Sequence, residues 1–282
     1  MKTAKTLGVA SLLAVAGLVA GQALRLSDKA RADRAWAELA RDAPAPARFD
    51  PRQLAGLPEP AQRYFRYAIA PGAELRTVAE ITMQGRFSLG SKPEPGYMPM
   101  RAREILAPPR GFVWLPAIGS GLMTFSGSDG LLHGQAWTRF WALGLIPVAR
   151  ASGGDDLARS AAARLFSEAA LWSPASMLPG PHVRWEAVDV DTARVVFQRP
   201  REPYAIDLTV APDGRPLSFV MQRWSNANAD KVFRSQPFGG TFAATRQFGD
   251  YTIPSRVSVG NHFGTDAYFP FFEATVTEAR FR

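Results

Sequence analysis

The feature that most constrains the fold of this 282-residue chain is a long series of segments in which apolar and polar residues alternate with a period of two. Such alternation is typical of β-strands with one buried face, and turn-forming residues separate the segments at hairpin-length intervals. The turn at 212–214 is the clearest hairpin signal. We expect strands within residues 77–89, 98–106, 111–115, 121–126, 131–140, 183–188, 193–198, 204–210, 217–221, 243–248, 253–259 and 273–281.

These segments predict a mainly β fold of the α+β class. The strands follow one another without a repeated strand–helix–strand alternation, which indicates an antiparallel sheet. A sheet of roughly ten to twelve strands tends to curl or close, so we expect a large curved sheet or half-barrel. An Ala-rich helix over residues 155–172 is predicted to lie across its concave face. N-terminal helices, one of them over residues 58–70, are expected to precede the sheet.

The first 26 residues are predicted to form a membrane anchor or a signal segment. Lys2 and Lys5 precede an uncharged run over residues 6–24, which as a helix spans roughly 28 Å, close to the hydrocarbon thickness of a bilayer. Two interpretations compete, because glycines soften this run and Gly21-Gln22-Ala23 fits a signal-peptide cleavage site. A signal-like segment favours a membrane-associated body that faces the periplasm. The Lys and Arg residues that follow it oppose export by the positive-inside count, which leaves the side of the membrane open.

The sequence suggests three parts: the segment 1–26, a linker helix with a Pro-rich connection over 27–56, and a single β-rich domain over 57–282. Ser27 is expected to cap the linker helix. Residues 1–110 contain 17 Lys and Arg against 10 Asp and Glu, so most of the net charge of +8 lies near the predicted membrane segment. Attraction to anionic headgroups makes a membrane the expected partner.

One constellation of polar residues suggests a site. Arg164, Glu168 and Trp172 are spaced by four residues and share one face of the predicted helix 155–172. If this face meets the sheet, burial raises the pKa of the Glu168 carboxyl while Arg164 lowers it, and the pair could poise an acid or base or recognise a polar head group. The alternative is an ordinary intrahelical ion pair beside a packed tryptophan.

Aromatic residues supply a second indication. Trp137, Phe140 and Trp141, together with Trp114 and the late aromatic run 269–272, could line an apolar cavity. The alternative is that they pack in the core. We take Trp114, Trp137 and Trp141, with the three helix residues, as candidate ligand-binding positions.

The sequence lacks the motifs of metal sites, serine hydrolases and RNA-binding proteins. The chain contains no cysteine, and His133, His182 and His262 have no metal-site spacing, so we expect no metal and no cofactor. Ser120 lies between two glycines but has no strand–elbow–helix context, which argues against a serine hydrolase. The arginines are scattered singly and aromatic RNA motifs are absent, so we expect no nucleic-acid partner.

Several short blocks together resemble the signature of an uncharacterised bacterial protein family, a domain of unknown function. The blocks are Arg63-Tyr64-Phe65, Gly111-Phe112-Val113-Trp114, the run 167–174 with Leu178-Pro179, and Gly249-Asp250-Tyr251 with Ile253-Pro254. The resemblance covers about residues 57–282 and implies no mechanism. More loosely, a many-stranded sheet with a helix across it looks like the half-barrel of periplasmic lipoprotein carriers, a likeness of fold only.

Three functions are consistent with the sequence. The first is a non-catalytic envelope protein that holds a lipid or another apolar ligand between sheet and helix. The second is a structural or interaction module that meets another envelope protein through an exposed sheet edge or apolar patch. The third is an enzyme that uses Glu168 as a general acid or base. A continuous apolar cavity of several hundred cubic ångströms would favour the first.

Overall fold

The computed structural model describes residues 2–41 and 47–282, with side chains from residue 16 onward. The elements are α1 (Lys2–Leu39), η1 (Pro51–Leu54), α2 (Glu59–Ala68), β1 (Ala79–Phe87), β2 (Met98–Ala107), β3 (Gly111–Ser120), β4 (Met123–Leu132), β5 (Gln135–Ala142), β6 (Ile146–Ser152), α3 (Asp155–Trp172), η2 (Pro174–Met177), β7 (Val183–Ala187), β8 (Thr192–Phe197), β9 (Tyr204–Val210), β10 (Pro216–Ser225), β11 (Arg234–Phe248), β12 (Tyr251–Asn261) and β13 (Phe269–Phe281).

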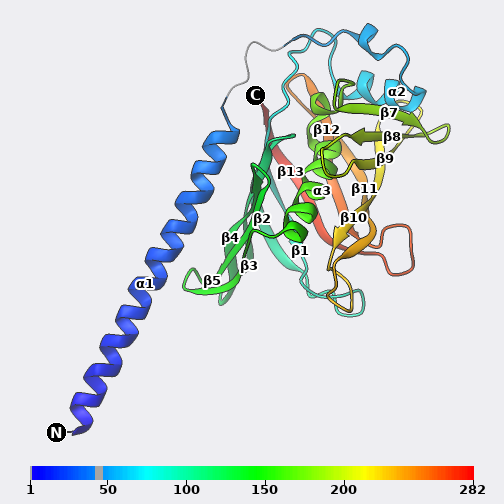
Figure 1. The fold of residues 1–282 in the computed structure, drawn as a ribbon. Coiled ribbons are helices and arrows are strands. Elements are labelled where there is room, and N and C mark those ends of the chain that lie inside the picture. The colour runs from blue at the N-terminus through cyan, green and yellow to red at the C-terminus, as the bar shows by residue number, and fades with distance from the viewer. Residues whose placement is uncertain (1, 42–46) are drawn as a thin grey trace.

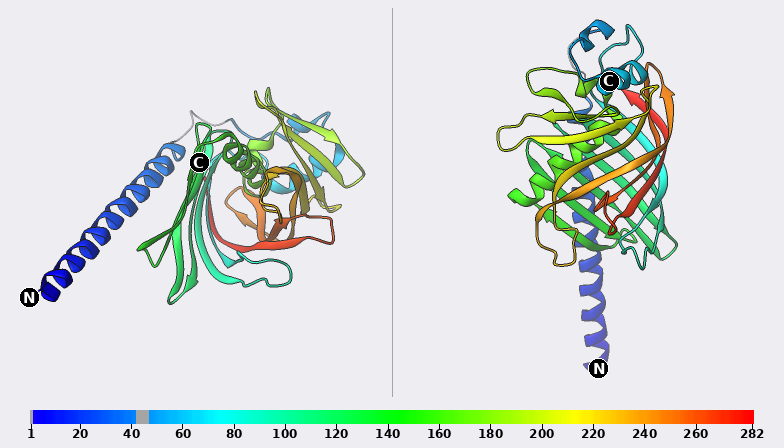
Figure 2. Two further views of the ribbon diagram at one scale, coloured as in Figure 1. Left: turned by 60° about the horizontal axis from the view of Figure 1, so that its bottom comes forward. Right: turned by 90° about the vertical axis from the view of Figure 1, so that its right-hand side faces the viewer.

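The strands form one open antiparallel sheet whose order follows the chain. β1 to β6 pair as one series and β7 to β13 as another, and β1 pairs with β13 to join the two. β6 and β7 are therefore the two edges of the sheet, and α3 is the segment that connects them. The sheet curves strongly, and α3 lies on its concave side (Figures 1 and 2). The predicted curved antiparallel sheet with a helix across it is confirmed.

The core lies between the concave face of the sheet and α3. Side chains at every second position of the strands point into it, as in the burial of Ile81 and Met83 on β1. Phe166 on α3 stacks on the rings of Phe197 and Tyr204 at centroid distances of 4.6 and 5.0 Å. The helix is thus fixed against the strands of the second series by aromatic contacts.

The strand predicted over 131–140 is wrong at one point. His133 and Gly134 break it into β4 and β5, with positive φ angles of 50° and 76°. Two consecutive residues with positive φ form the type of turn that matches the twist of a hairpin. His133 is therefore a turn residue.

Helix α1 differs from the prediction of two separate N-terminal elements. It runs without a break from Lys2 to Leu39, so Ser27 lies inside the helix and does not cap it. The physical reason is that residues 25–41 contain neither glycine nor proline, and nothing interrupts helical hydrogen bonding there. The N-terminal part of α1 projects beyond the sheet, whereas its last turns pack on the convex face through Ala32, Ala35 and Leu39 (Figure 1).

The expectation of a transmembrane helix within residues 1–26 is not met. Among the residues that the structure describes, no helix is both long enough and apolar enough to cross a membrane.

Candidate functional site

A cavity of about 470 Å³ lies between α3 and the concave face of the sheet. Its lining is mostly apolar and rich in aromatic rings from both halves of the sheet, among them Phe87, Trp114, Phe140, Phe219, Phe238 and Phe271. The polar residues that line it are Asp129, Thr138, Arg164, Ser167, Glu168 and Arg223. An apolar cavity with a few polar side chains at one place is the usual form of a small-molecule site, whose volume is about 300–1,000 Å³.

Strand register places four of the residues of this region in one row across the sheet. Glu104 on β2 pairs with Trp114 on β3, Trp114 pairs with Asp129 on β4, and Asp129 pairs with Thr138 on β5. The Thr138 hydroxyl donates to Asp129 Oδ1 at 2.8 Å. Directly paired residues point to the same face of a sheet, so the row presents two carboxyl groups to α3.

Arg164 of α3 connects the helix to this row. Its guanidinium donates to Glu168 Oε1 at 2.7 Å, to Asp129 Oδ2 at 2.7 Å and to Glu104 Oε1 at 3.1 Å. It also lies 4.7 Å from the ring centre of Phe112 and 5.0 Å from that of Trp114. Burial disfavours the charged guanidinium, but the three carboxyl groups outweigh it and raise the pKa of Arg164 above its ordinary value.

Glu104 is completely buried and belongs to the same cluster. Burial raises the pKa of its carboxyl well above the usual range, and the adjacent Glu168 carboxyl, within hydrogen-bonding reach, adds to this against the opposing effect of Arg164. Glu104 therefore keeps its proton at pH values where an exposed glutamate is ionised. Two neighbouring carboxyl groups in a site of low dielectric constant do not readily both ionise, so their titrations are coupled.

Arg223 of β10 is a second cation in the wall of the cavity. Its guanidinium lies 4.7 Å from the ring centre of Phe238 and contacts Ser160 Oγ at 3.3 Å, and within the described residues it forms no ion pair. Burial, together with the charge of Arg164, lowers the pKa of Arg223 to about 10. A cation held in this way is desolvated without a close counter-charge.

Three residues of the cavity wall have buried polar atoms without a hydrogen-bond partner among the described residues. These atoms are Trp114 Nε1, Glu168 Oε2 and Arg223 Nε. Buried polar atoms in folded proteins are nearly always paired, and each unpaired one costs about 1–3 kcal/mol. Trp114 Nε1 and Arg223 Nε are thus left as donors for a group that enters the cavity, whereas Glu168 Oε2 is within reach of the protonated Glu104 carboxyl.

The mouth of the cavity is apolar. Leu89 and Val148 line the cavity and are also 74% and 51% exposed. Phe125, close to the start of β4, is a further lining residue, whereas Asp129 lies four residues farther along the strand, about 13 Å deeper. The polar cluster is therefore inside the cavity, and the apolar wall lies toward the solvent.

The structure brings together four of the six candidate residues. Arg164, Glu168, Trp172 and Trp114 line the cavity. Trp137 and Trp141 do not line it, because they lie at odd positions of β5 and point to the convex face, whereas Phe140 points inward. Period-two alternation already separates Phe140 from both tryptophans.

Glu104, Asp129 and Arg223 line or adjoin the cavity but are not among the residues predicted from the sequence. Each occupies an inward position of a strand whose other inward residues are mostly apolar, as Glu104 does between Ala102 and Leu106. The sequence signal for such a residue is a charge at one of the alternating strand positions that are otherwise apolar. The partners that such a residue meets are not visible in the strand itself.

Trp141 belongs to a different cluster on the convex face. Its Nε1 donates to Asp28 Oδ2 of α1 at 3.2 Å. Asp28 also accepts from both Nη atoms of Arg150, at 3.0 Å for the Nη2 contact with Oδ1, and lies 3.5 Å from Arg139 Nε. These contacts hold the middle of α1 on β5 and β6.

Comparison with known proteins identifies the family. The model of a family of unknown function, DUF6544, matches residues 47–274. The chain belongs to this family. No curated protein matches the chain. Among solved structures, a crystal structure of a domain from Vibrio parahaemolyticus, described as an outer membrane lipoprotein-sorting protein domain, is similar with a TM-score of 0.38 and 13% identity, over 73% of this chain and 85% of that chain. This likeness is too weak to carry over any property of that domain.

In this DUF6544 member, two of the predicted signature blocks meet in space. Trp172 Nε1, in the block that ends α3, donates to the carbonyl of Pro254 in the block that begins β12, at 3.2 Å. The Tyr251 hydroxyl donates to the Glu74 carbonyl at 2.6 Å and accepts from the Arg76 N–H at 2.8 Å. The Trp172–Pro254 hydrogen bond fixes the end of α3 against the sheet, and Trp172 is part of the cavity wall.

Proposed function

We propose that the protein binds a single-chain lipid with a small polar head group, such as a fatty acid, in the cavity beneath α3, and that it does so without catalysing a reaction. The observation that carries the proposal is the pair of unpartnered buried donors, Trp114 Nε1 and Arg223 Nε, in a mostly apolar cavity. A carboxyl group accepts hydrogen bonds from these two donors. The acyl chain then extends along the aromatic wall toward the mouth.

The surroundings of the mouth support transfer of this ligand at a membrane of the bacterial envelope. The N–H of Leu143 donates to the Thr124 carbonyl at 2.8 Å, so the β5–β6 turn lies beside the start of β4. Exposed apolar side chains cluster on these turns and on the loop after β1: Leu89, Leu122, Met123, Leu143, Leu145, Ile146 and Val148. An exposed apolar patch next to a cavity mouth is suited to contact with lipid.

The experiment measures binding of a fluorescent long-chain fatty acid to the full chain. Arg223→Met removes the unpaired donor, and Ala149→Trp fills part of the cavity, so each is expected to weaken binding about tenfold or more. Arg256→Met serves as the matched control, because Arg256 is exposed on β12 and does not line the cavity. Native mass spectrometry of protein purified from its own membranes identifies the natural ligand by its mass.

The proposal fails if the wild type does not bind the probe saturably, or if both cavity variants bind it as the control does. The Arg223→Met variant also distinguishes a loss of ligand binding from a loss of folding. Its removal eliminates an unpaired buried charge, so the free energy of unfolding is expected to stay unchanged or rise while binding is lost.

A second candidate function is an enzyme in which Glu168 acts as a general acid or base. The observation that favours it is the position of the Glu168 carboxyl beside Arg164 and beside the Glu104 carboxyl, whose pKa is raised. A site of this kind can move a proton at neutral pH. Turnover of an acyl ester probe that Glu168→Gln abolishes, while binding of the fatty acid persists, would select this function over simple binding.

A further inference from the structure

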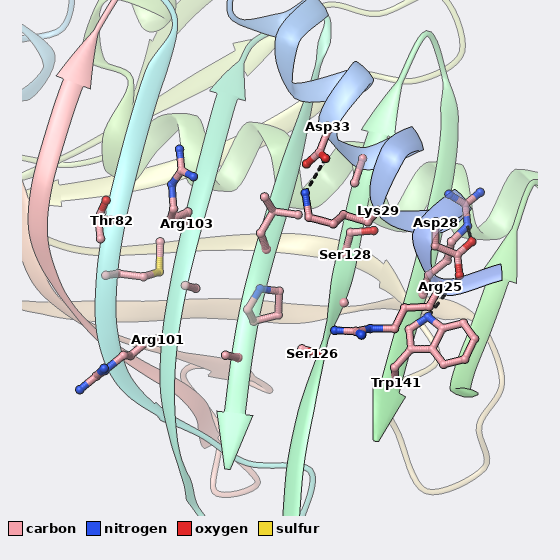
Figure 3. Close-up of a pocket in the computed structure, with 18 of the residues that line it drawn as sticks. Arg25, Asp28, Lys29, Asp33, Thr82, Arg101, Arg103, Ser126, Ser128 and Trp141 are labelled. Carbon is pink, nitrogen blue, oxygen red and sulfur yellow. Dashed lines mark hydrogen bonds and ion pairs between the residues drawn. The ribbon is translucent and has the colours of Figure 1, made fainter. Parts of the chain in front are cut away.

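A second hollow lies on the opposite face of the sheet, between α1 and strands β1–β5 (Figure 3). It has a volume of about 530 Å³. Its floor is made of small residues: Ala117 on β3 pairs with Ser126 on β4, and Gly127 follows. Arg101 on β2 pairs with Ala117, and Trp141 on β5 pairs with Ser126, so larger side chains flank the floor on both sides.

Positive charge predominates in this groove. Five cationic residues and two carboxylates line it: Arg25, Lys29, Arg101, Arg103 and Arg139, with Asp28 and Asp33. Both carboxylates already have partners, because Asp33 Oδ2 lies 2.6 Å from Lys29 Nζ and Asp28 binds Arg150. Within the described residues, Arg25, Arg101 and Arg103 form no ion pair. Three guanidinium groups are therefore without a counter-charge.

The cations also affect one another. Burial lowers the pKa of Arg139, and although Asp28 opposes this, the positive charges of Arg31 and Arg150 lower it further. Arg103 lies over the ring of Trp36 at 4.8 Å from its centre, which fixes it beside α1. An anion in the groove would relieve this repulsion and would be attracted by the combined field of the cations.

We propose that this groove binds a phosphate-class anion, either a soluble phosphate or the phosphate of a lipid headgroup. Arg101 and Arg103 lie on β2, which is two strands, or about 10 Å, away from Ser126 on β4. An arginine side chain can reach across this distance toward the floor of the groove. Arg25 approaches from α1. Guanidinium groups match phosphate oxygens in a fork geometry, and the hydroxyls of Thr82, Ser126 and Ser128 supply further donors around the floor.

The anion site is independent of the lipid cavity, because neighbouring residues of one strand serve the two faces. Ser128 lines the groove and Asp129 lines the cavity. The two sites are thus separated by the thickness of the sheet, and loss of one leaves the other in place.

The test compares the full-length wild type with Arg101→Gln/Arg103→Gln. Both arginines are exposed and unpaired among the described residues, so the fold is expected to remain intact. The control is Arg66→Gln/Lys231→Gln, which removes the same charge from exposed positions outside the groove. Titration with inorganic phosphate, followed by tryptophan fluorescence, forms one arm. Cosedimentation with phosphatidylglycerol vesicles, against phosphatidylcholine vesicles, forms the other.

We expect the groove variant to bind at least tenfold more weakly than the control in the arm that corresponds to the natural source. Saturable binding of inorganic phosphate that the groove variant weakens assigns a soluble phosphate. Binding of phosphatidylglycerol vesicles that it weakens, without binding of inorganic phosphate, assigns a lipid headgroup. The proposal is overturned if the groove and control variants behave alike in both arms, or if acetate binds as tightly as phosphate.

Discussion

The concave and convex faces of the sheet carry two polar clusters with opposite arrangements of charge. On the concave face, one cation, Arg164, is surrounded by Glu104, Asp129 and Glu168. On the convex face, one anion, Asp28, accepts hydrogen bonds from Arg150 and Trp141. The first cluster is enclosed between helix and sheet and is coupled to the whole fold. The second cluster attaches α1 to the convex face of the sheet at β5 and β6.

The difference shows how burial decides what an ionic cluster does. Removing the central cation on the concave face leaves three carboxyl groups without a counter-charge, and one of them, Glu104, is completely buried. Removing the central anion on the convex face leaves Arg150, which can turn to solvent because its side chain is 34% exposed, and Arg139, whose side chain is 14% exposed. The first change should therefore affect global stability and the second mainly the seating of α1.

The largest effect is expected for Arg164→Met. It leaves Glu104, Asp129 and Glu168 without their shared cation, and we expect a loss of about 3–5 kcal/mol in the free energy of unfolding. Chemical denaturation monitored by circular dichroism measures it. Arg159→Met is the matched control on α3, because the Arg159–Glu202 pair is partly exposed and should contribute about 1 kcal/mol or less. Equal losses in the two variants would show that the concave cluster is not a coupled buried network.

The pH dependence of stability provides a second test of the concave cluster. The pKa of Glu104 is raised from 4.5 on folding, so the folded protein keeps a proton that the unfolded chain releases. Stability should therefore be highest below about pH 4.5 for this group and should fall by up to about 1.4 kcal/mol per pH unit until the pH reaches the folded-state pKa.

Glu104→Gln is expected to remove this slope, because an amide of the same shape carries no proton to lose. Unfolding midpoints across a pH series, with wild type and variant in parallel, measure the difference. An unchanged slope in the variant would assign the pH dependence to other groups.

The same comparison shows how far the sequence predicts this molecule. Alternation in each strand and an Ala-rich helix between two series of strands were sufficient for the curved sheet and for α3, since these patterns are local. The spacing of Arg164 and Glu168 predicted their contact for the same reason. The Arg164–Glu104 contact joins residues 60 positions apart in the chain and depends on how β2 meets α3, which no local pattern contains.

The convex cluster was missed for a related reason. Asp28 was treated as part of a linker, and its contact with Arg150 spans 122 positions. The aromatic run of β5 predicts Trp141 in the cavity, whereas strand register places it on the convex face. Applying the period of two to every aromatic and charged residue would have placed Trp141 outside and Glu104 inside.

The smallest of these effects is expected for Asp28→Asn. The substitution weakens the contacts with Arg150 and Arg139 and should cost about 1–2 kcal/mol, confined to the docking of α1. Hydrogen exchange in residues 25–39 should speed up by about tenfold while exchange in β1–β4 stays unchanged. Asp33→Asn is the control, since the Lys29–Asp33 pair is exposed and should contribute only about 0.2–0.5 kcal/mol.

The pH response of α1 sharpens this last test because its sign is opposite to that of Glu104. Burial opposes ionisation of Asp28, but the Arg150 hydrogen bond and charge outweigh it and lower its pKa from 3.8. The stabilisation is therefore complete above about pH 3.8 and is lost as the pH falls through the folded-state pKa. Acidification should weaken the docking of α1, whereas protonation of Glu104 should stabilise the concave cluster. If both faces instead respond to acid in the same direction, the two clusters are not separate electrostatic units.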